Sequence, residues 1–264
     1  MKKLISILLV ALLLIPLFAG CAGSEDDDLQ RIKKNGKLVI GITEYAPMNY
    51  YDEGGTLIGF DTEYAEAVCA KLGVKPEFVV INWDTKEVEL KAKNIDCIWN
   101  GLTVTEERKE NMEFSSPYIV NEQVVLVRSA DLEKYSKKES LSGVAVVAEA
   151  GSAGESAIEA DLSDAKYTAV ASQANALLEV KAGTSEAAVI DATMAFAMTG
   201  PGTDYSDIVV SKDIDLMDEE YAIGFRLGSA LVKKVDEITQ GLLKDGTLKA
   251  IAEKYDLADR LISG

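Results

Sequence analysis

The chain of 264 residues contains no histidine and only three cysteines, and both shortages limit its chemistry. A Ser-His-Asp or Cys-His triad is impossible without histidine. Zinc is held mainly by cysteine and histidine, and the cysteines and carboxylates present do not stand at spacings typical of such a site. The sequence therefore predicts no triad hydrolase, no metal site and no cofactor.

Basic residues are few compared with acidic ones. The chain has 27 Lys and Arg against 44 Asp and Glu, which gives a formal net charge of −17. Nucleic-acid-binding proteins carry basic patches, and attachment to anionic lipid headgroups needs them too. We therefore expect no nucleic-acid partner, and a charge that mainly keeps the protein soluble.

Long apolar runs are also missing, except at the N-terminus. Two lysines precede an apolar run from Leu4 to Phe18, which is shorter than the roughly 20 residues that span a bilayer. A basic flank, an apolar run and small residues are typical of a secretory signal. The small residues before Cys21 are similar to a lipobox, which implies a lipidated cysteine; a plain secretory signal and a retained anchor are the alternatives. We predict a signal peptide at 1–20, a lipidated Cys21 with a tether at 21–36, and a protein anchored to the outer face of the cell membrane.

The other two cysteines are predicted to be buried thiols. Cys69 lies on the apolar face of a predicted helix, and Cys97 lies in a predicted strand. Unpaired cysteine packs as a small apolar residue, and we favour this over a disulfide between the two.

Apolar strands alternate with helices along the rest of the chain. The stretch 38–42 is continuous and apolar, as a buried parallel strand should be, and Asp61 is placed to cap the helix that follows. Repeated strand and helix units predict an α/β fold with parallel sheets. Ligands of such sheets bind at the carboxyl ends of strands. Residues that closely follow predicted strands are Tyr45, Trp83, Asn100, Gly101 and Asp191.

The stretch from Asp96 to Arg108 breaks a local rule. Thr105 has the position of a helix N-cap, yet Arg108 puts a cation into the first helical turn, where the helix dipole opposes it. Such a violation is expected at functional sites. A guanidinium beside free N–H groups and the Thr103 hydroxyl can bind a carboxylate through two bonds. The alternative is a surface arginine paired with a nearby acid.

This stretch, followed by Phe114-Ser-Ser-Pro-Tyr118, resembles the signature of the family 3 extracellular solute-binding proteins, the amino-acid receptors of ABC importers. The resemblance extends from about Lys37 to the C-terminus. The matching residues are Asp96, Gly101, Thr103, Thr105, Glu107, Arg108, Phe114, Ser115, Pro117 and Tyr118.

The resemblance implies the two-lobed periplasmic-binding-protein type II fold. Each lobe would be a mostly parallel sheet flanked by helices, and two crossing hinge strands would join the lobes. Lobe 1 is expected at 37–126 plus 222–264, and lobe 2 at 127–221. The protein would be a monomeric extracytoplasmic receptor that captures a free amino acid between its closing lobes and passes it to an ABC permease.

The resemblance also implies roles for the marked residues. Tyr45 and Trp83 correspond to aromatic residues that face the bound amino acid, although ordinary core packing is the alternative for each. Backbone at Asn100 and Gly101, together with Thr103 and Arg108, corresponds to the cradle for the α-carboxylate. Two further features lie in lobe 2. The turn with Ser152 and Ala153 precedes a helix whose N–H groups can add to that cradle, and Asp191 corresponds to the acid that receives the α-ammonium, with a plain N-cap as the alternative.

Two glutamates bear on the choice of amino acid. Glu44 and Glu149 stand near the expected position of the ligand side chain, which favours a polar or cationic amino acid, but both can equally point to solvent.

Two other functions use the same fold. One is a dehydratase-like enzyme, for which only Glu44, Glu149 and Tyr45 are placed to act as acid or base. The other is a sensory or adhesive surface lipoprotein.

Overall fold

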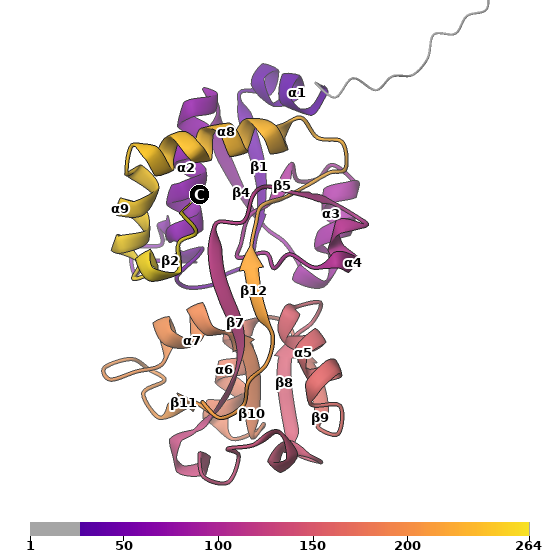
Figure 1. Cartoon of the computed structure of the whole chain (residues 1–264), viewed down its shortest axis with the longest axis vertical. Helices are drawn as coiled ribbons and strands as arrows, with labels where there is room; N and C mark the ends of the chain where they lie inside the picture. Colours follow the sequence, from indigo (N-terminus) through magenta and orange to yellow (C-terminus); the bar gives the residue numbers. More distant parts are fainter. Residues whose placement is uncertain (1–26, 264) are drawn as a thin grey trace, which may run out of the picture.

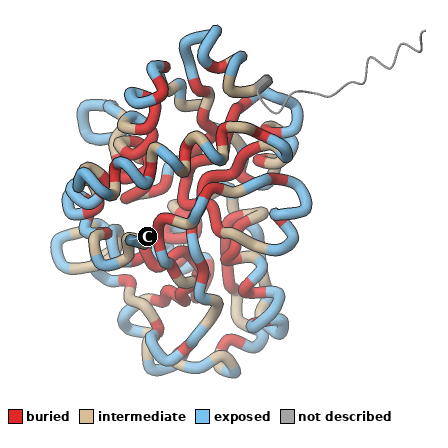
Figure 2. Tube along the Cα trace, turned by 45° about the horizontal axis from the view of Figure 1, so that its top comes forward, coloured by how far each residue is buried: buried red, intermediate tan, exposed pale blue. Residues whose placement is uncertain are grey.

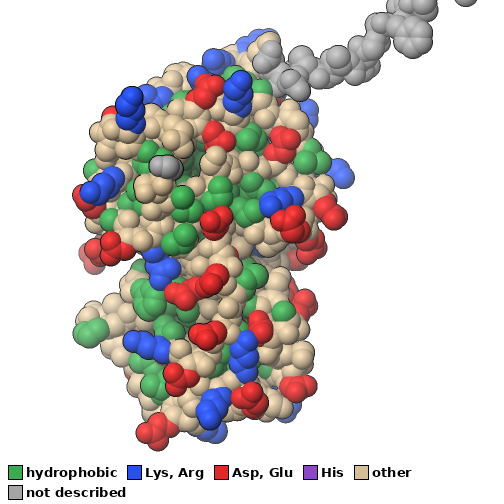
Figure 3. Space-filling model, viewed as in Figure 1, with side chains coloured by type: hydrophobic (Ala, Val, Ile, Leu, Met, Phe, Trp, Pro, Cys, Tyr) green, Lys and Arg blue, Asp and Glu red, His purple; other side chains and the backbone are tan. Residues whose placement is uncertain are grey.

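The computed structural model describes residues 27–263, which form two lobes stacked end to end (Figure 1). The predicted signal peptide and Cys21 lie outside the described residues. Within residues 27–263, no helix is long and apolar enough to cross a membrane. Acidic side chains are scattered over both lobes on the face shown in Figure 3.

Lobe 1 is built on a five-stranded sheet. β1 pairs in parallel with β4 and β5, whereas β13 pairs antiparallel with β5 and β6. β1 is buried along most of its length, as its unbroken apolar sequence predicts. In spatial order the strands are β4 (Lys75–Val80), β1 (Lys37–Ile42), β5 (Cys97–Ile98), β13 (Gly224–Phe225) and β6 (Glu113–Phe114).

Helices cover this sheet, and a small two-stranded ribbon lies beside it. The core contains an aromatic group in which Tyr64 packs edge-on against Trp99, with ring centroids 4.7 Å apart. The elements are α1 (Asp27–Asn35), α2 (Phe60–Leu72), α3 (Lys86–Lys91), α4 (Glu106–Lys109), α8 (Leu231–Lys244), α9 (Thr247–Lys254), the 3₁₀ helices η1 (Trp83–Thr85) and η4 (Ala258–Arg260), and the ribbon strands β2 (Tyr50–Tyr51) and β3 (Leu57–Ile58).

Helix α1 belongs to the folded body. Ile32 is buried in the core of lobe 1, and Arg31 forms an ion pair with Asp96. Asp96 also pairs with Arg226 at 3.2 Å and accepts the Val39 N–H at 3.0 Å. This first residue of the signature stretch is therefore structural. The part of the predicted tether from residue 27 onward is helix packed on lobe 1.

Lobe 2 repeats the same plan. β8 pairs in parallel with β9 and β10, and β7 and β11 add antiparallel strands. The strands in spatial order are β11 (Ile208–Val210), β7 (Ile119–Arg128), β10 (Ala187–Asp191), β8 (Ala145–Glu149) and β9 (Lys166–Val170). The helices are α5 (Ala153–Asp161), α6 (Gln173–Ala182) and α7 (Ala192–Met198), with the 3₁₀ helices η2 (Ser129–Asp131) and η3 (Lys138–Leu141).

Two strands cross between the lobes. β12 (Asp218–Tyr221) pairs antiparallel with the first part of β7, from Tyr221 opposite Ile119 to Asp218 opposite Glu122. Figure 1 shows both strands running through the waist of the molecule. The predicted α/β fold with two lobes and two hinge strands is confirmed. Each sheet also gains antiparallel strands, because the chain returns through each lobe in the opposite direction. The residue limits predicted for the lobes stay a prediction.

Buried residues follow the strands through the centre of each lobe, and the outer faces of the helices are exposed (Figure 2). Cys69 and Cys97 are both free and fully buried, so the prediction of two buried thiols is confirmed. Burial raises the pKa of the Cys69 thiol to about 12. A thiol with so high a pKa carries almost no thiolate and is chemically inert.

Candidate functional site

A small cavity of about 10 Å³ lies between the lobes. It lies where β1, β4, β5, β8 and β10 end, so the carboxyl ends of strands from both sheets converge on it. Its volume leaves room for about one water molecule, so an amino acid can enter only when the lobes separate. The lining residues are Thr43, Tyr45, Trp83, Asn100, Gly101, Thr103, Arg108, Glu149, Ser152, Ala153, Gln173 and Asp191.

Nine of the ten predicted ligand-binding residues line this cavity. The exception is Glu44, which is exposed. Its neighbours Thr43 and Tyr45 are buried and turned into the cavity, and adjacent side chains of an extended segment point to opposite sides. The predicted place of Glu44 beside the ligand side chain is therefore wrong. A ligand-binding role for the other nine stays a prediction.

Arg108 is buried and has no carboxylate partner among the described residues. The predicted cap at Thr105 is present, since its hydroxyl oxygen accepts the Arg108 N–H at 3.1 Å. The guanidinium is 7% exposed and donates to the carbonyl oxygens of Thr103 at 2.8 Å and Gly151 at 3.1 Å. None of the ion pairs in residues 27–263 includes it. The surface-pair alternative is thus wrong, because the guanidinium is a buried cation that lines the cavity between the lobes.

Burial lowers the pKa of Arg108, while Glu219 and other nearby acids raise it again. The guanidinium stays charged, because arginine does not lose its proton in proteins. Among the described residues, the Arg108 charge is balanced by the dipoles of backbone carbonyls and by acids too far away to contact it. A ligand carboxylate would therefore find a desolvated cation already in place, which strengthens the attraction between them.

Hydrogen bonds between the Asn100 side chain and the Thr43 backbone fix the Asn100-Gly101 loop. The Asn100 amide group donates to the Thr43 carbonyl at 3.0 Å and accepts the Thr43 N–H at 3.0 Å. Gly101 has φ of 57°, and a Cβ there would lie 2.6 Å from the Tyr45 ring, so this position requires glycine.

The Gly101 N–H has a different partner from the one predicted. It donates to Asp61 Oδ2 at 2.7 Å, and Asp61 also accepts the Tyr118 hydroxyl at 2.9 Å. What Gly101 can offer a ligand is its carbonyl oxygen, which suits an ammonium group. The expected Asp61 cap is also wrong: α2 begins at Phe60 after Gly59, and Asp61 is fully buried beneath the loop.

Other donors can take over the carboxylate role. Ser152 caps α5 through its hydroxyl oxygen, which accepts the Glu155 N–H at 3.2 Å. The N–H groups of Thr103 and Ala153 have no acceptor within the described part of the chain. With Arg108 they form a set of donors on both sides of the cavity, one from the first turn of a helix.

Direct contacts across the cavity hold the two lobes together. The Tyr45 hydroxyl of lobe 1 forms a hydrogen bond with Thr193 of α7. Lys86 of lobe 1 lies over the Trp83 ring, 5.0 Å from its centroid, and donates to the Gly151 carbonyl at 2.8 Å. Burial and the nearby Arg108 lower the pKa of Lys86 to about 8. The structure therefore represents the closed arrangement of the lobes.

Glu149, at the end of β8, is buried in the cavity, in contrast to Glu44. Its side chain is 3% exposed, and its Oε1 atom has no hydrogen-bond partner among the described residues. Burial and the charge of Asp191 raise the pKa of Glu149 to about 8, and Lys86 opposes this rise. The cavity thus contains an acid with one carboxyl oxygen that accepts no hydrogen bond from the described residues.

Asp191 ends β10 and precedes α7, but it does not cap that helix with its side chain. Its carboxylate accepts hydrogen bonds from three side-chain amides, those of Asn121, Gln123 and Gln173. Its own N–H donates to Gln173 Oε1 at 2.9 Å. The N-cap alternative is therefore wrong, and the carboxylate is fixed in direction by a ring of amides.

Sequence reasoning missed these amides and the acid beside them, Glu219. Asn121 and Gln123 stand two residues apart on β7, the spacing that puts side chains on one face of a strand. This pair of amides on one face of a mostly apolar strand was the available signal. Gln173 gave none, because it reads as an ordinary first residue of a helix.

Residues 38–258 match the family model of the bacterial extracellular solute-binding proteins, family 3. The chain belongs to this family. It is a solute-binding protein with curated relatives of similar length. The L-cystine-binding protein TcyJ of Escherichia coli is 25% identical over 95% of both chains. The probable amino-acid-binding protein YxeM of Bacillus subtilis is 32% identical over 97% of this chain and 95% of that protein.

Solved structures of solute-binding proteins agree with the fold. An amino acid ABC transporter substrate-binding protein from Streptococcus pneumoniae, bound to L-arginine, superimposes with a TM-score of 0.79. It is 29% identical, and the match covers 90% of this chain and 99% of that one. The fold of this solute-binding protein is thus that of a type II amino-acid-binding protein.

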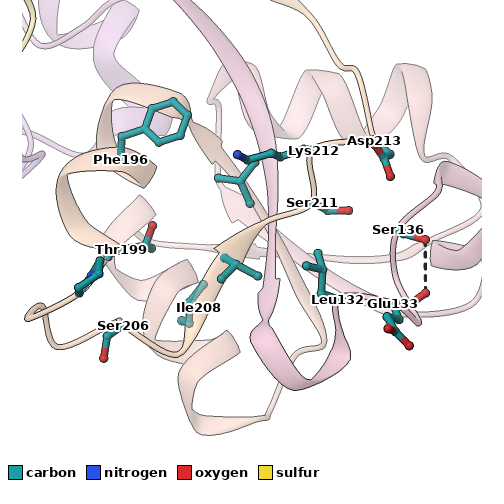
Figure 4. Close-up of a pocket in the computed structure, with 14 residues that line it drawn as sticks. Leu132, Glu133, Ser136, Phe196, Thr199, Ser206, Ile208, Ser211, Lys212 and Asp213 are labelled. Atoms are coloured by element: carbon teal, nitrogen blue, oxygen red, sulfur yellow. Dashed lines mark hydrogen bonds between the residues drawn. The ribbon is translucent and has the colours of Figure 1, made fainter.

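A wider hollow lies on lobe 2, away from the cavity between the lobes (Figure 4). Its polar side chains lie apart, and the hydrogen bond drawn in it joins the Ser136 hydroxyl to the Glu133 carbonyl. Lys212 and Asp213 at its edge are exposed. A site that recognises a small ligand needs convergent polar groups, and this hollow lacks them.

Proposed function

We propose that this protein captures a free amino acid between its lobes and delivers it to the permease of an ABC importer. One observation carries the proposal. Arg108, a buried cation without a carboxylate partner, comes from lobe 1 and lines the same cavity as the Asp191 carboxylate of lobe 2. An amino acid offers a carboxylate and an ammonium group a few bonds apart, which complements this pair.

Roles for the lining residues follow from their chemistry. Arg108, the Thr103 hydroxyl and the N–H groups of Thr103 and Ala153 receive the α-carboxylate. Asp191 and the Gly101 carbonyl receive the α-ammonium. Tyr45 and Trp83 enclose the apolar part of the ligand, while Asn100 and Ser152 hold their loops in shape.

Such a ligand would drive closure. Because its two charges contact opposite lobes, it binds the closed form more tightly than the open form and shifts the population toward it. The loss of hydration of the ligand offsets part of this gain. The closed form then presents a changed surface to the permease.

A thermal-shift screen tests this function. The purified domain, from about residue 24, would be heated with each of the twenty amino acids and with L-cystine. A ligand at one hundred times its dissociation constant stabilises the folded state by about 2.7 kcal/mol. For a domain of this size that corresponds to a rise in melting temperature of roughly 5–10 °C. Equal melting temperatures with every compound would refute the proposal.

We further propose that the preferred amino acid is polar or cationic. Glu149 is a buried acid with an unsatisfied oxygen in the cavity. The ligands of the similar proteins fit this acid, because L-arginine carries a guanidinium and L-cystine a second ammonium group. A neutral aliphatic side chain would leave the Glu149 carboxyl without a partner.

Replacing Glu149 by glutamine tests this preference. The variant keeps the size of the side chain but cannot ionise when a cationic ligand group binds, so binding of L-arginine is expected to weaken by roughly 30-fold or more, equivalent to about 2 kcal/mol. Binding of a neutral polar amino acid such as L-glutamine should change by less than about threefold. Calorimetry of both proteins with both amino acids measures the ratio. An unchanged ratio would show that Glu149 does not select the side chain.

The protein is extracytoplasmic, as its family is. We propose that lipid on Cys21 anchors it to the outer face of the membrane, and that it acts as a monomer. The relatives are substrate-binding proteins by name, so a dehydratase-like enzyme is not favoured. A permease gene and an ATPase gene beside its own would distinguish an importer receptor from a sensory or adhesive lipoprotein.

A further inference from the structure

Two carboxyl groups from different elements share the same hydrogen-bond donors. Asn121 donates through Nδ2 to Asp191 Oδ1 at 3.1 Å and also to Glu219 Oε1. Gln123 donates through Nε2 to the same two oxygens, with 3.0 Å to Glu219. Asp191 ends β10 of lobe 2, whereas Glu219 lies on hinge strand β12. One amide nitrogen touching both oxygens brings the carboxyls within a few ångströms of each other.

Within residues 27–263, no cation forms an ion pair with either carboxyl of this pair. Asp191 is 5% and Glu219 7% exposed, and neither forms an ion pair with any described residue. The Glu219 Oε2 atom has no hydrogen-bond partner in the part of the chain that is described. Two carboxylates so close in a desolvated site cannot both be charged without a large cost, which favours a proton held between them. Burial and the charge of Asp191 raise the pKa of Glu219 well above its usual range.

The other titratable groups around the pair do not supply the positive charge that would let both carboxyls ionise. Arg108 on α4 is the nearby cation that favours ionisation of the pair, but its guanidinium bonds to backbone carbonyls. The hydroxyls of Tyr45, in the loop after β1, and of Tyr221, on β12, lie near the pair, and burial raises the pKa of both, so they stay neutral. Glu149 at the end of β8 has a pKa raised to about 8 by burial and by the charge of Asp191, so it is mostly protonated at pH 7 and supplies no positive charge to the pair.

We propose that the Asp191–Glu219 pair holds one proton in the ligand-free cavity and releases it to solvent when the ammonium group of an amino acid binds. This inference rests on the proposed function and makes Glu219 a second acid of the ammonium site. The incoming cation supplies the charge that the pair lacks, so both carboxylates can ionise. The proton leaves to water, and the ammonium group stays protonated.

Proton release makes capture depend on pH. Below the pH at which the free pair ionises, the association constant rises with pH by up to tenfold per unit, because one proton leaves for each ligand bound. Because Glu219 lies on a strand that crosses between the lobes, its ionisation state is linked to a segment that moves on closure.

Calorimetry measures the number of protons released. L-Arginine, L-cystine and each amino acid that raises the melting temperature would be titrated at pH 7 in buffers of low and high ionisation enthalpy. Wild type is expected to release about one proton more per ligand than Glu219→Gln. Glutamine keeps the Oε1 acceptor for Asn121 and Gln123. The matched control is Glu220→Gln, an exposed glutamate on the same strand, which should behave as wild type.

The outcomes separate the two proposals. Equal proton release by wild type and Glu219→Gln overturns this inference and leaves the receptor function intact. No binding heat with any of these compounds overturns the receptor function itself. In that case, carbon-13 NMR of the ligand-free protein, labelled at the Asp and Glu carboxyls, shows whether the pair holds a proton. A carboxyl still protonated at pH 7 and missing in Glu219→Gln supports the shared proton, and full ionisation of the pair by pH 6 refutes it.

Discussion

Replacement of Arg108 by alanine is expected to weaken amino-acid binding by roughly a hundred- to a thousandfold, equivalent to about 3–4 kcal/mol. The guanidinium is buried, has no carboxylate partner among the described residues and lines the cavity between the lobes. Without it, the ligand carboxylate would lose its bidentate partner after losing its own hydration. The rise in melting temperature produced by any amino acid should disappear, and titration calorimetry should measure the lost affinity.

Two further variants sharpen this test. Lys109 is a neighbouring cation on the same helix; it is exposed and pairs with Glu106 at 2.6 Å. The variant Lys109→Ala should therefore bind amino acids as wild type does. Arg108→Lys keeps the charge but loses the planar fork, so an intermediate affinity is expected. Alanine at position 108 with full affinity would show that the carboxylate binds elsewhere in the cavity.

The second large effect concerns Asp61 and the pH dependence of stability. Burial raises the pKa of Asp61 to about 7, although its hydrogen bonds from Gly101 and Tyr118 oppose the rise. In the unfolded chain an aspartate has a pKa of about 3.9. The folded state therefore binds this proton more tightly. The stability that the protonated group contributes is complete below pH 4 and is lost as pH rises to 7, by up to about 4 kcal/mol in total.

Asp61→Asn should remove this dependence, because asparagine is neutral at every pH. Between pH 5 and pH 8 the free energy of unfolding of the variant is expected to rise relative to wild type by about 3 kcal/mol. Urea unfolding of the ligand-free protein at pH 5, 6, 7 and 8 measures this difference. Asp213→Asn, an exposed aspartate in lobe 2, is the control and should run parallel to wild type. Parallel curves for Asp61→Asn as well would show that Asp61 is ionised in the folded protein throughout.

Local sequence was sufficient for the α/β class and for marking several residues of the cavity, whereas the two-lobed arrangement was implied by the family resemblance. Continuous apolar strands followed by polar or aromatic residues predicted where strand ends carry functional groups, and Tyr45, Trp83 and Asp191 all line the cavity. The cation in the first turn of α4 predicted that Arg108 has a special role. Both signals are local, because burial of a strand and the dipole of a helix depend on residues close in the chain.

Other features depended on contacts between distant segments. Glu44 and Glu149 are both glutamates at or just beyond a strand end, yet one is exposed and the other is buried in the cavity. Asp61 has the sequence position of a helix cap, but in the fold it is buried and accepts the N–H of Gly101, 40 residues away.

The sequence alone thus determined the α/β class and the places where the main strands end, and it marked Arg108 as unusual without deciding whether it is buried. The tertiary structure decided which acids share the cavity, because Asn121 and Glu219, 98 residues apart, meet only when the two hinge strands pair. The pKa of a carboxyl depends on burial and on the charges around it. Those surroundings exist only in the folded chain, so the chemistry of the acids could not be predicted from their neighbours in sequence.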